Sequence, residues 1–154
     1  MSVYTKREIL KFIEEEDVSF IRLQFSDVLG KMRNIAVTKD KIGDALDNEC
    51  SFDGSVIDGF AEGTELYLYP DLDTFTIFPW RPHTGRVARL ICDIYNADGT
   101  RYEHDPRYVL QKAVEEAKAY GYTLNVGAEC EFFLFKTDES GNPTLEPHDN
   151  AGYF

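Results

Sequence analysis

The sequence predicts an α+β fold in which a mixed β-sheet has a helix across one face. Two observations lead to this fold class. Over the first hundred residues, segments whose apolar side chains alternate with polar ones are interleaved with segments whose apolar side chains recur at helical spacing. Their order along the chain is helix, two strands, helix and then further strands, which is typical of a sheet and helices that share one core.

A short helix and a β-hairpin are predicted first. Thr5 and Glu8 have the spacing of a capping box, and a helix is expected over about residues 6–16. Residues 20–27 alternate apolar and polar side chains, and residues 31–38 follow at hairpin distance. These two segments therefore predict neighbouring antiparallel strands.

A second short helix and a long loop are expected next. Apolar side chains recur at helical spacing within residues 39–48. Residues 50–64 hold three glycines and several acids without a sustained period, which makes this segment too long for a tight turn. We interpret it as a functional loop.

The strands that follow complete the sheet. Residues 65–80 read as two strand pieces interrupted by Pro70 and Pro79, and residues 86–96 as a buried strand that ends at the turn 97–100. A β-grasp arrangement fits this order of elements, as do other α+β folds.

The last third of the chain predicts one more helix and one more strand. Asp105 and Pro106 form an N-cap and first-turn pair, and the helix is expected to run up to Gly121. Its expected core-facing stripe is Leu110, Ala113, Val114 and Ala117. A buried strand is predicted over residues 123–137, followed by a turn. The turn at 97–100 is the best boundary, which gives domains at 1–103 and 104–154.

Composition narrows the class of protein. The 154 residues include 28 acidic and 16 basic side chains, so a net charge of -12 disfavours binding to nucleic acid. The absence of a long apolar run or a leader predicts a cytoplasmic protein. Three cysteines without C-x-x-C spacing predict reduced packing residues. The final residues follow a turn signal without a closing helix, so we expect a truncated chain.

Glu129 and Glu131 are the first candidate site residues. In a strand they share one face, with Cα atoms roughly 6.5–7 Å apart, while Cys130, Phe132 and Leu134 point into a core. Two neighbouring carboxylates repel each other unless a cation lies between them, and hard oxygen donors suit Mg²⁺ or Mn²⁺. The alternative is a face that is solvated or paired with Lys or Arg.

Asp53 is the other candidate. It precedes Gly54 in a turn that could aim its carboxylate at a cation or an ammonium group, although Asp-Gly is also an ordinary turn pair. His83, His104 and His148 lack metal-ligand spacing, and no role is assigned to them.

Several motifs together resemble one enzyme family. "SFDGSVIDGF", "LYLYPDLDTFTIFPW", "ARLICDIYNADGT", "DPRYVLQKAVEEA" and "GAECEFFLF" occur in the order and spacing of a bacterial type I glutamine synthetase, most like those of Gram-positive bacteria. The resemblance covers about residues 4–154. It implies a β-grasp domain followed by the first helix and strand of the catalytic domain.

The resemblance also implies activity, site residues and partners. The family joins ammonia to glutamate through a γ-glutamyl phosphate, using ATP with Mg²⁺ or Mn²⁺, in dodecamers of two hexameric rings. Its metal-binding glutamates fall on Glu129 and Glu131. Its aspartate that binds ammonium at a neighbouring subunit falls on Asp53, and Ser55 shapes the same turn. The fragment alone is expected to be inactive.

The sequence departs from the family at two places. Val56 replaces a serine that many members have, and residues 61–65 are about two residues shorter than usual and lack the arginine that Gram-positive relatives use in feedback inhibition. Two other functions remain open: a γ-glutamyl-polyamine ligase on the same scaffold, or a β-grasp interaction or regulatory module without catalysis.

Overall fold

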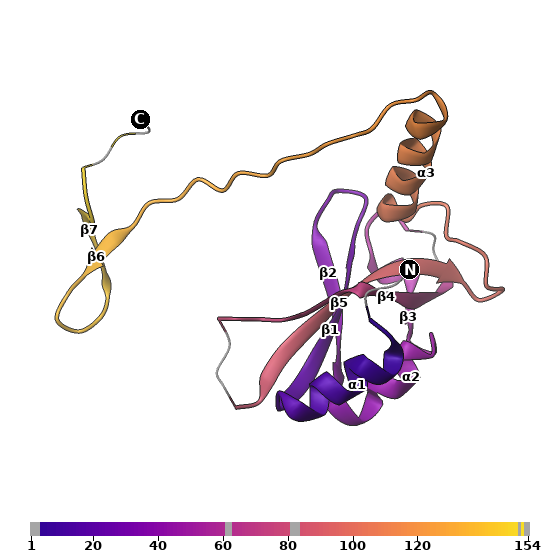
Figure 1. The fold of residues 1–154 in the computed structure, drawn as a ribbon, viewed down its shortest axis with the longest axis horizontal. Coiled ribbons are helices and arrows are strands. Elements are labelled where there is room, and N and C mark those ends of the chain that lie inside the picture. The colour runs from indigo at the N-terminus through magenta and orange to yellow at the C-terminus, as the bar shows by residue number, and fades with distance from the viewer. Residues whose placement is uncertain (1–3, 61–62, 81–83, 151, 153–154) are drawn as a thin grey trace. The chain divides into compact units, whose positions relative to one another are not determined.

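The structure is a computed structural model that describes residues 4–60, 63–80, 84–150 and 152. It divides into two compact units, residues 1–123 and residues 124–154, which are described separately (Figure 1). This division into compact units does not test the expected boundary between domains at residues 103 and 104, which stays a prediction. His83 and the first two residues of the shortened stretch, Ala61 and Glu62, lie outside the described residues.

The first unit is built on a five-stranded mixed sheet with the strand order β2-β1-β5-β4-β3. β1 and β5 run parallel, and the other neighbouring pairs are antiparallel. This arrangement confirms the predicted mixed sheet and the hairpin. The elements are α1 (Lys6–Glu15), β1 (Val18–Ser26), β2 (Met32–Thr38), η1 (Lys39–Lys41), α2 (Ile42–Leu46), β3 (Ser51–Asp53), η2 (Gly54–Val56), β4 (Glu65–Ile77) and β5 (Arg86–Asn96).

The core lies between the sheet and the two helices α1 and α2, which pack against it (Figure 1). The capping box predicted at Thr5 and Glu8 is present, and α1 buries Ile9 and Ile13. Every second side chain of the central strands is turned into this core, as their alternating pattern predicted. These side chains are Ile21, Leu23 and Phe25 of β1, and Ala88, Leu90, Cys92 and Ile94 of β5.

Two predictions for the middle of the chain were wrong in part. β4 is one strand that continues through Pro70, which lies opposite Cys92 of β5. Because β3 pairs with β4 only as far as Tyr67, Pro70 is at an edge position where its missing N–H costs no ladder bond. The expected loop at residues 50–64 also contains the short strand β3 and the single turn η2.

The helix α3 (Pro106–Ala119) has the predicted N-cap, and this cap is also its attachment to the sheet. Asp105 is buried; its carboxylate accepts hydrogen bonds from the N–H of Arg107 (3.0 Å) and from the N–H of Ile94 in β5 (3.1 Å). Arg107 also pairs with Asp93 of β5 at 2.9 Å. The first turn of α3 is therefore fixed to β5 by charged groups.

The expected core-facing stripe of α3 was wrong. Leu110 is 56% exposed and Val114 is 39% exposed, and the structure buries no residue of this helix. Periodicity predicted an amphipathic helix, but within the described part of the first unit no element covers its apolar side. Contacts at the first turn hold α3 instead.

The second unit contains one hairpin, β6 (Phe135–Thr137) and β7 (Pro143–Pro147), around the predicted turn. Asp138 fixes this turn by accepting hydrogen bonds from the N–H groups of Ser140 and Asn142, both at 2.9 Å. The buried strand predicted over residues 123–137 was wrong: only its last three residues form a strand, β6, and all three are exposed. Residues 124–134 form neither helix nor strand, and Cys130, Phe132 and Leu134 are exposed.

Two further expectations concern cysteines and membranes. All three cysteines are free, as predicted, but only Cys92 is fully buried, whereas Cys130 is exposed and packs no core. Burial raises the pKa of the Cys92 thiol, so it stays protonated. No helix in the described part of the chain is long and apolar enough to span a membrane.

The buried cap at Asp105 predicts a large loss of stability in Asp105→Ala. Removing the carboxylate leaves the buried N–H of Ile94 without its partner and α3 without its cap, so the free energy of unfolding should fall by about 2–3 kcal/mol. Urea unfolding measures this. Asp98→Ala is the matched control, because Asp98 caps an exposed turn through Thr100, where water can replace the carboxylate. Equal losses in the two variants would contradict the assignment.

Candidate functional site

Asp53 is the last residue of β3, at the edge of the sheet. β3 pairs with β4 so that Asp53 lies opposite Glu65 and Phe52 opposite Leu66. Since side chains alternate along a strand, Phe52 turns toward the core and stacks on Phe25 with 4.9 Å between ring centroids, while Asp53 is exposed. The sheet thus fixes the backbone of Asp53 and leaves its carboxylate outside.

The turn after Asp53 is held at both ends. Gly54 is buried and donates its N–H to the carbonyl of Thr64 at 2.9 Å, which closes the base of the loop. Ile57 then donates its N–H to the carbonyl of Gly54 at 3.0 Å, which closes the turn η2. The carboxylate is therefore presented by a turn whose backbone is satisfied.

The Asp53 carboxylate is pre-oriented by Ser55. Its Oδ1 accepts hydrogen bonds from the Ser55 hydroxyl at 2.7 Å and from the Ser55 N–H at 2.9 Å. The hydroxyl bond and then the N–H bond hold the pKa of Asp53 below its ordinary value, because both favour the charged form. Asp53 is thus anionic at neutral pH, and among the described residues no hydrogen bond engages its second oxygen, Oδ2.

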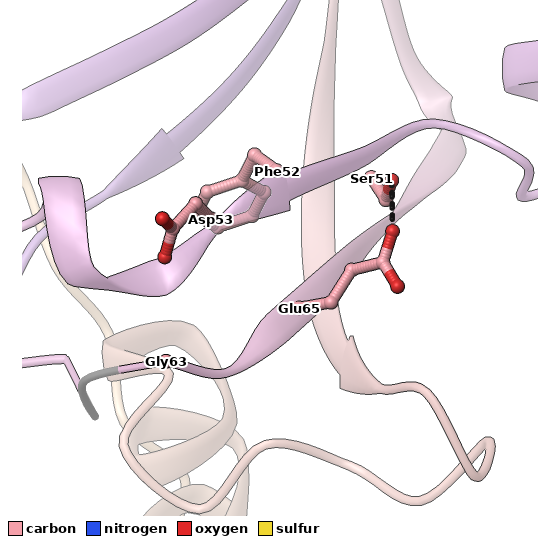
Figure 2. A pocket seen from close by; sticks show the side chains of 5 residues that line it. All are labelled: Ser51, Phe52, Asp53, Gly63 and Glu65. Atoms are coloured by element: carbon pink, nitrogen blue, oxygen red, sulfur yellow. Dashed lines mark hydrogen bonds between the residues drawn. The ribbon is translucent and has the colours of Figure 1, made fainter.

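A pocket of about 310 Å³ lies beside Asp53 and is lined by Ser51, Phe52, Asp53, Gly63 and Glu65 (Figure 2). Within it, Glu65 is turned toward Ser51, whose hydroxyl donates to Glu65 Oε1 at 2.9 Å (Figure 2). The Glu65 carboxylate points toward Ser51 and away from that of Asp53, but both line the pocket, and two negative charges favour a cationic ligand over an anionic one. Sequence reasoning missed Glu65, because only the β3–β4 register brings it opposite Asp53.

Glu129 and Glu131 lie in the extended segment of the second unit, and both are exposed. The predicted geometry of two carboxylates on one face of a buried strand is not formed, since residues 124–134 have no strand partner among the described residues. A single extended segment leaves its backbone groups to water and does not hold side chains in fixed directions. Their role as metal ligands stays a prediction.

The chemistry of these two side chains fits a divalent cation. Both are carboxylates, the ligands that Mg²⁺ and Mn²⁺ prefer, and they are separated by a single residue. They supply only part of a coordination shell. Within residues 4–60, 63–80, 84–150 and 152, no group of three or more His, Cys, Asp or Glu side chains is placed to hold a metal ion.

The two described histidines are part of ordinary contacts. His104 makes an edge-on contact with Tyr102, with 5.4 Å between ring centroids, and His148 lies 3.7 Å from the carboxylate of Asp149.

Of the predicted site residues, the structure brings Asp53 and Ser55 together in the first unit, with Glu65 on the neighbouring strand. Glu129 and Glu131 are neighbours in the second unit.

Comparisons with known sequences agree along the whole chain. The family model described as "Glutamine synthetase, beta-Grasp domain" matches residues 17–97, and the one described as "Glutamine synthetase, catalytic domain" matches residues 103–154. A glutamine synthetase of Clostridium saccharobutylicum is 56% identical over 156 residues, which cover 100% of this chain and 35% of the relative. A glutamine synthetase of Staphylococcus aureus (strain Mu50 / ATCC 700699) is 53% identical over 154 residues, which cover 98% of this chain and 34% of the relative. The chain spans about a third of the length of these relatives.

Solved structures share the fold. A cryo-EM structure of Plasmodium falciparum glutamine synthetase superposes with a TM-score of 0.66 at 21% identity, over 79% of this chain and 24% of that one. A structure described as "Apo GmaS without ligand" superposes with a TM-score of 0.64 at 22% identity, over 73% of this chain and 26% of that one. At these identities the likeness supports the β-grasp fold alone.

The Ser55 hydrogen bonds predict a measurable change in Ser55→Ala. Losing the hydroxyl removes the larger cause of the lowered pKa, so the pKa of Asp53 should rise toward its ordinary value of about 3.9. A carboxyl ¹³C NMR titration measures this shift. Asp98 and Thr100 form the same motif elsewhere, so Thr100→Ala should raise the pKa of Asp98 and leave Asp53 unchanged. An unchanged Asp53 titration in Ser55→Ala would show that the turn does not orient this carboxylate.

Proposed function

We propose that this chain, which belongs to the glutamine synthetase family, is the N-terminal part of an ATP-dependent ligase that joins ammonia to the side-chain carboxylate of glutamate. In this reaction ATP phosphorylates that carboxylate, and ammonia then displaces phosphate from the γ-glutamyl phosphate. The observation that carries the proposal is the anionic, pre-oriented Asp53, next to a pocket with a second carboxylate. Such a site attracts ammonium.

Asp53 has two tasks in the proposed mechanism. Its negative charge stabilises NH₄⁺, and the same carboxylate then accepts a proton, which leaves NH₃ with the free electron pair that attacks the phosphorylated carboxyl carbon. Ser55 supports the first task by keeping Asp53 ionised and directed outward. Val56, which is 70% exposed, stands where many relatives have a hydroxyl, so this position contributes no side-chain hydrogen bond.

Glu129 and Glu131 are the proposed ligands for Mg²⁺ or Mn²⁺. When bound, such an ion neutralises charge on the phosphate oxygens of ATP during phosphoryl transfer. Burial of Phe132 and Leu134 against further strands would place the two glutamates on the opposite face, in the paired geometry that the alternation of this segment indicates. The exposure of Phe132 and Leu134 is consistent with a segment whose partner strands belong to other parts of the proposed enzyme.

The proposed enzyme has the domain and subunit organisation of its family. Residues 1–103 form the β-grasp domain, and residues 104–154 begin the catalytic domain. Asp53 serves the active site of a neighbouring identical subunit, within a cytoplasmic dodecamer of two hexameric rings. Residues 1–154 alone are expected to be inactive, because they span only 35% of the matched relative.

A chimera tests the function directly. Residues 1–154 replace the corresponding 35% of the Clostridium saccharobutylicum relative. The chimera should form glutamine from glutamate, ammonia and ATP only when Mg²⁺ or Mn²⁺ is present. Glu129→Ala and Glu131→Ala should each lower kcat at least about 100-fold, because each removes a charged metal ligand. Coupled ADP release and glutamine formation measure the rate, and calorimetry measures Mn²⁺ binding.

Controls separate the alternatives. Glu139→Ala removes an exposed glutamate in the β6–β7 turn and should leave both Mn²⁺ affinity and rate unchanged. Polyamines offered in place of ammonia should not be consumed; if they are preferred, the chain belongs to an amine ligase. Full activity of Glu129→Ala and Glu131→Ala would contradict the metal assignment, and a stable, oligomeric chimera that consumes no ATP would favour a non-catalytic module.

A further inference from the structure

The tip of the β1–β2 hairpin is unusually well fixed for an exposed turn. Asp27 at its start is completely buried, and its carboxylate accepts hydrogen bonds from the N–H groups of Leu29 (3.0 Å) and Lys31 (2.9 Å) and from Nε of Arg33 (2.9 Å). The backbone of Asp27 closes the same turn, since its N–H donates to the Lys31 carbonyl at 3.0 Å. Few other conformations would satisfy a buried carboxylate so fully.

The charge of Asp27 is retained despite its burial. Burial acts to raise its pKa, but the hydrogen bonds from Lys31, Arg33 and Leu29 together outweigh it and hold the pKa below the ordinary value. The carboxylate is therefore ionised at neutral pH, and all three donors remain engaged. The residue that follows it, Val28, is thereby held in a defined position.

Val28 lies directly against the loop that carries Asp53. Gly59 in this loop has φ +84, a conformation that favours glycine, and a Cβ added there would come within 2.3 Å of Val28 Cγ2. The two chain segments thus approach as closely as a glycine allows. The contact joins the hairpin tip to residues 54–60, which are far from it in the sequence.

The same loop is anchored at two further points. Ile57 is 8% exposed and Phe60 is 7% exposed, so both are packed into the core. The ring of Phe60 stacks on that of Phe25, with 6.4 Å between ring centroids, and meets the ring of Tyr102 edge-on, with 5.2 Å between centroids. Between these two anchors, Gly59 has Val28 against it, so the hairpin tip limits how far the segment after Asp53 can move outward.

We propose that Val28 and Gly59 are positioning residues for Asp53: the hairpin tip, fixed by Asp27, presses on Gly59 and keeps the turn after Asp53 in its binding conformation. The contact between Val28 and Gly59 is steric, because neither residue carries a charged side chain. Its kinetic consequence rests on the proposed function, in which Asp53 binds ammonium, whereas its structural consequence does not.

The structural consequence is tested in the 154-residue chain by amide hydrogen exchange. The probes are the N–H groups of Ile57 and Phe60, which donate to the carbonyls of Gly54 and Ile57 at 3.0 Å each. Val28→Ala removes the contact and should speed their exchange about tenfold. Val28→Thr keeps the branched shape, and Leu29→Ala removes a neighbouring side chain that is 78% exposed; both should leave the two amides within about twofold of the native rate.

Two results of this experiment would overturn the proposal. One is equal exchange at Ile57 and Phe60 in Val28→Ala and Leu29→Ala. The other is an acceleration in Val28→Ala that extends equally to Leu90 in the centre of β5, since that would be a general loss of stability. Acceleration confined to the loop supports it.

The kinetic consequence is tested in the chimera. Val28→Ala should raise KM for ammonium about tenfold and leave KM for glutamate unchanged, because only the ammonium site depends on Asp53. Val28→Thr, which keeps the branched shape, should have the native KM for ammonium. Equal increases in both KM values, or none, would overturn the kinetic part. If the native chimera forms no glutamine, the proposed function fails, and hydrogen exchange alone decides whether Val28 positions the loop.

Discussion

The pairing of β5 with β1 on one side and β4 on the other holds the first unit together. One face of β5 buries four side chains completely, and its other face carries Asp93, which pairs with Arg101 and Arg107. β4 is fixed by β5, and β3 is fixed by β4. The position of Asp53 at the edge therefore depends on packing two strands away, which gives an exposed carboxylate a rigid support.

The carboxylates of this acidic chain divide by how fully they are satisfied. Asp27 and Asp105 are buried and accept hydrogen bonds from backbone N–H groups, so they hold a turn and a helix in place. Within the described part of the chain, Asp53 accepts hydrogen bonds only from Ser55, and it stays exposed. An oriented but exposed carboxylate is accessible to a ligand, whereas a buried carboxylate whose partners lie inside the fold is not.

Local rules predicted much of the fold. Alternation identified β1 and β5, and cap chemistry identified the starts of α1 and α3. The prediction failed where a partner decides the outcome: Pro70 lies within a strand because β4 has an edge there, and residues 124–134 form no strand without a neighbour to pair with. Local patterns made Glu129, Glu131 and Asp53 candidates, and the family motifs supplied their expected roles and added Ser55. No pattern could predict the contact between Val28 and Gly59, because it depends on how two distant loops pack.

In the proposed function, Asp53 acts in the active site of a neighbouring subunit, whereas Glu129 and Glu131 act in their own, and this is its central claim. Subunit mixing tests this most directly. Chimeras with Asp53→Ala and with Glu129→Ala should each be inactive alone, but co-expressed in equal amounts they should regain on the order of a quarter of native activity, since that share of interfaces combines two intact contributions. If the mixed oligomers form and remain inactive, Asp53 and Glu129 serve the same subunit and the claim is wrong.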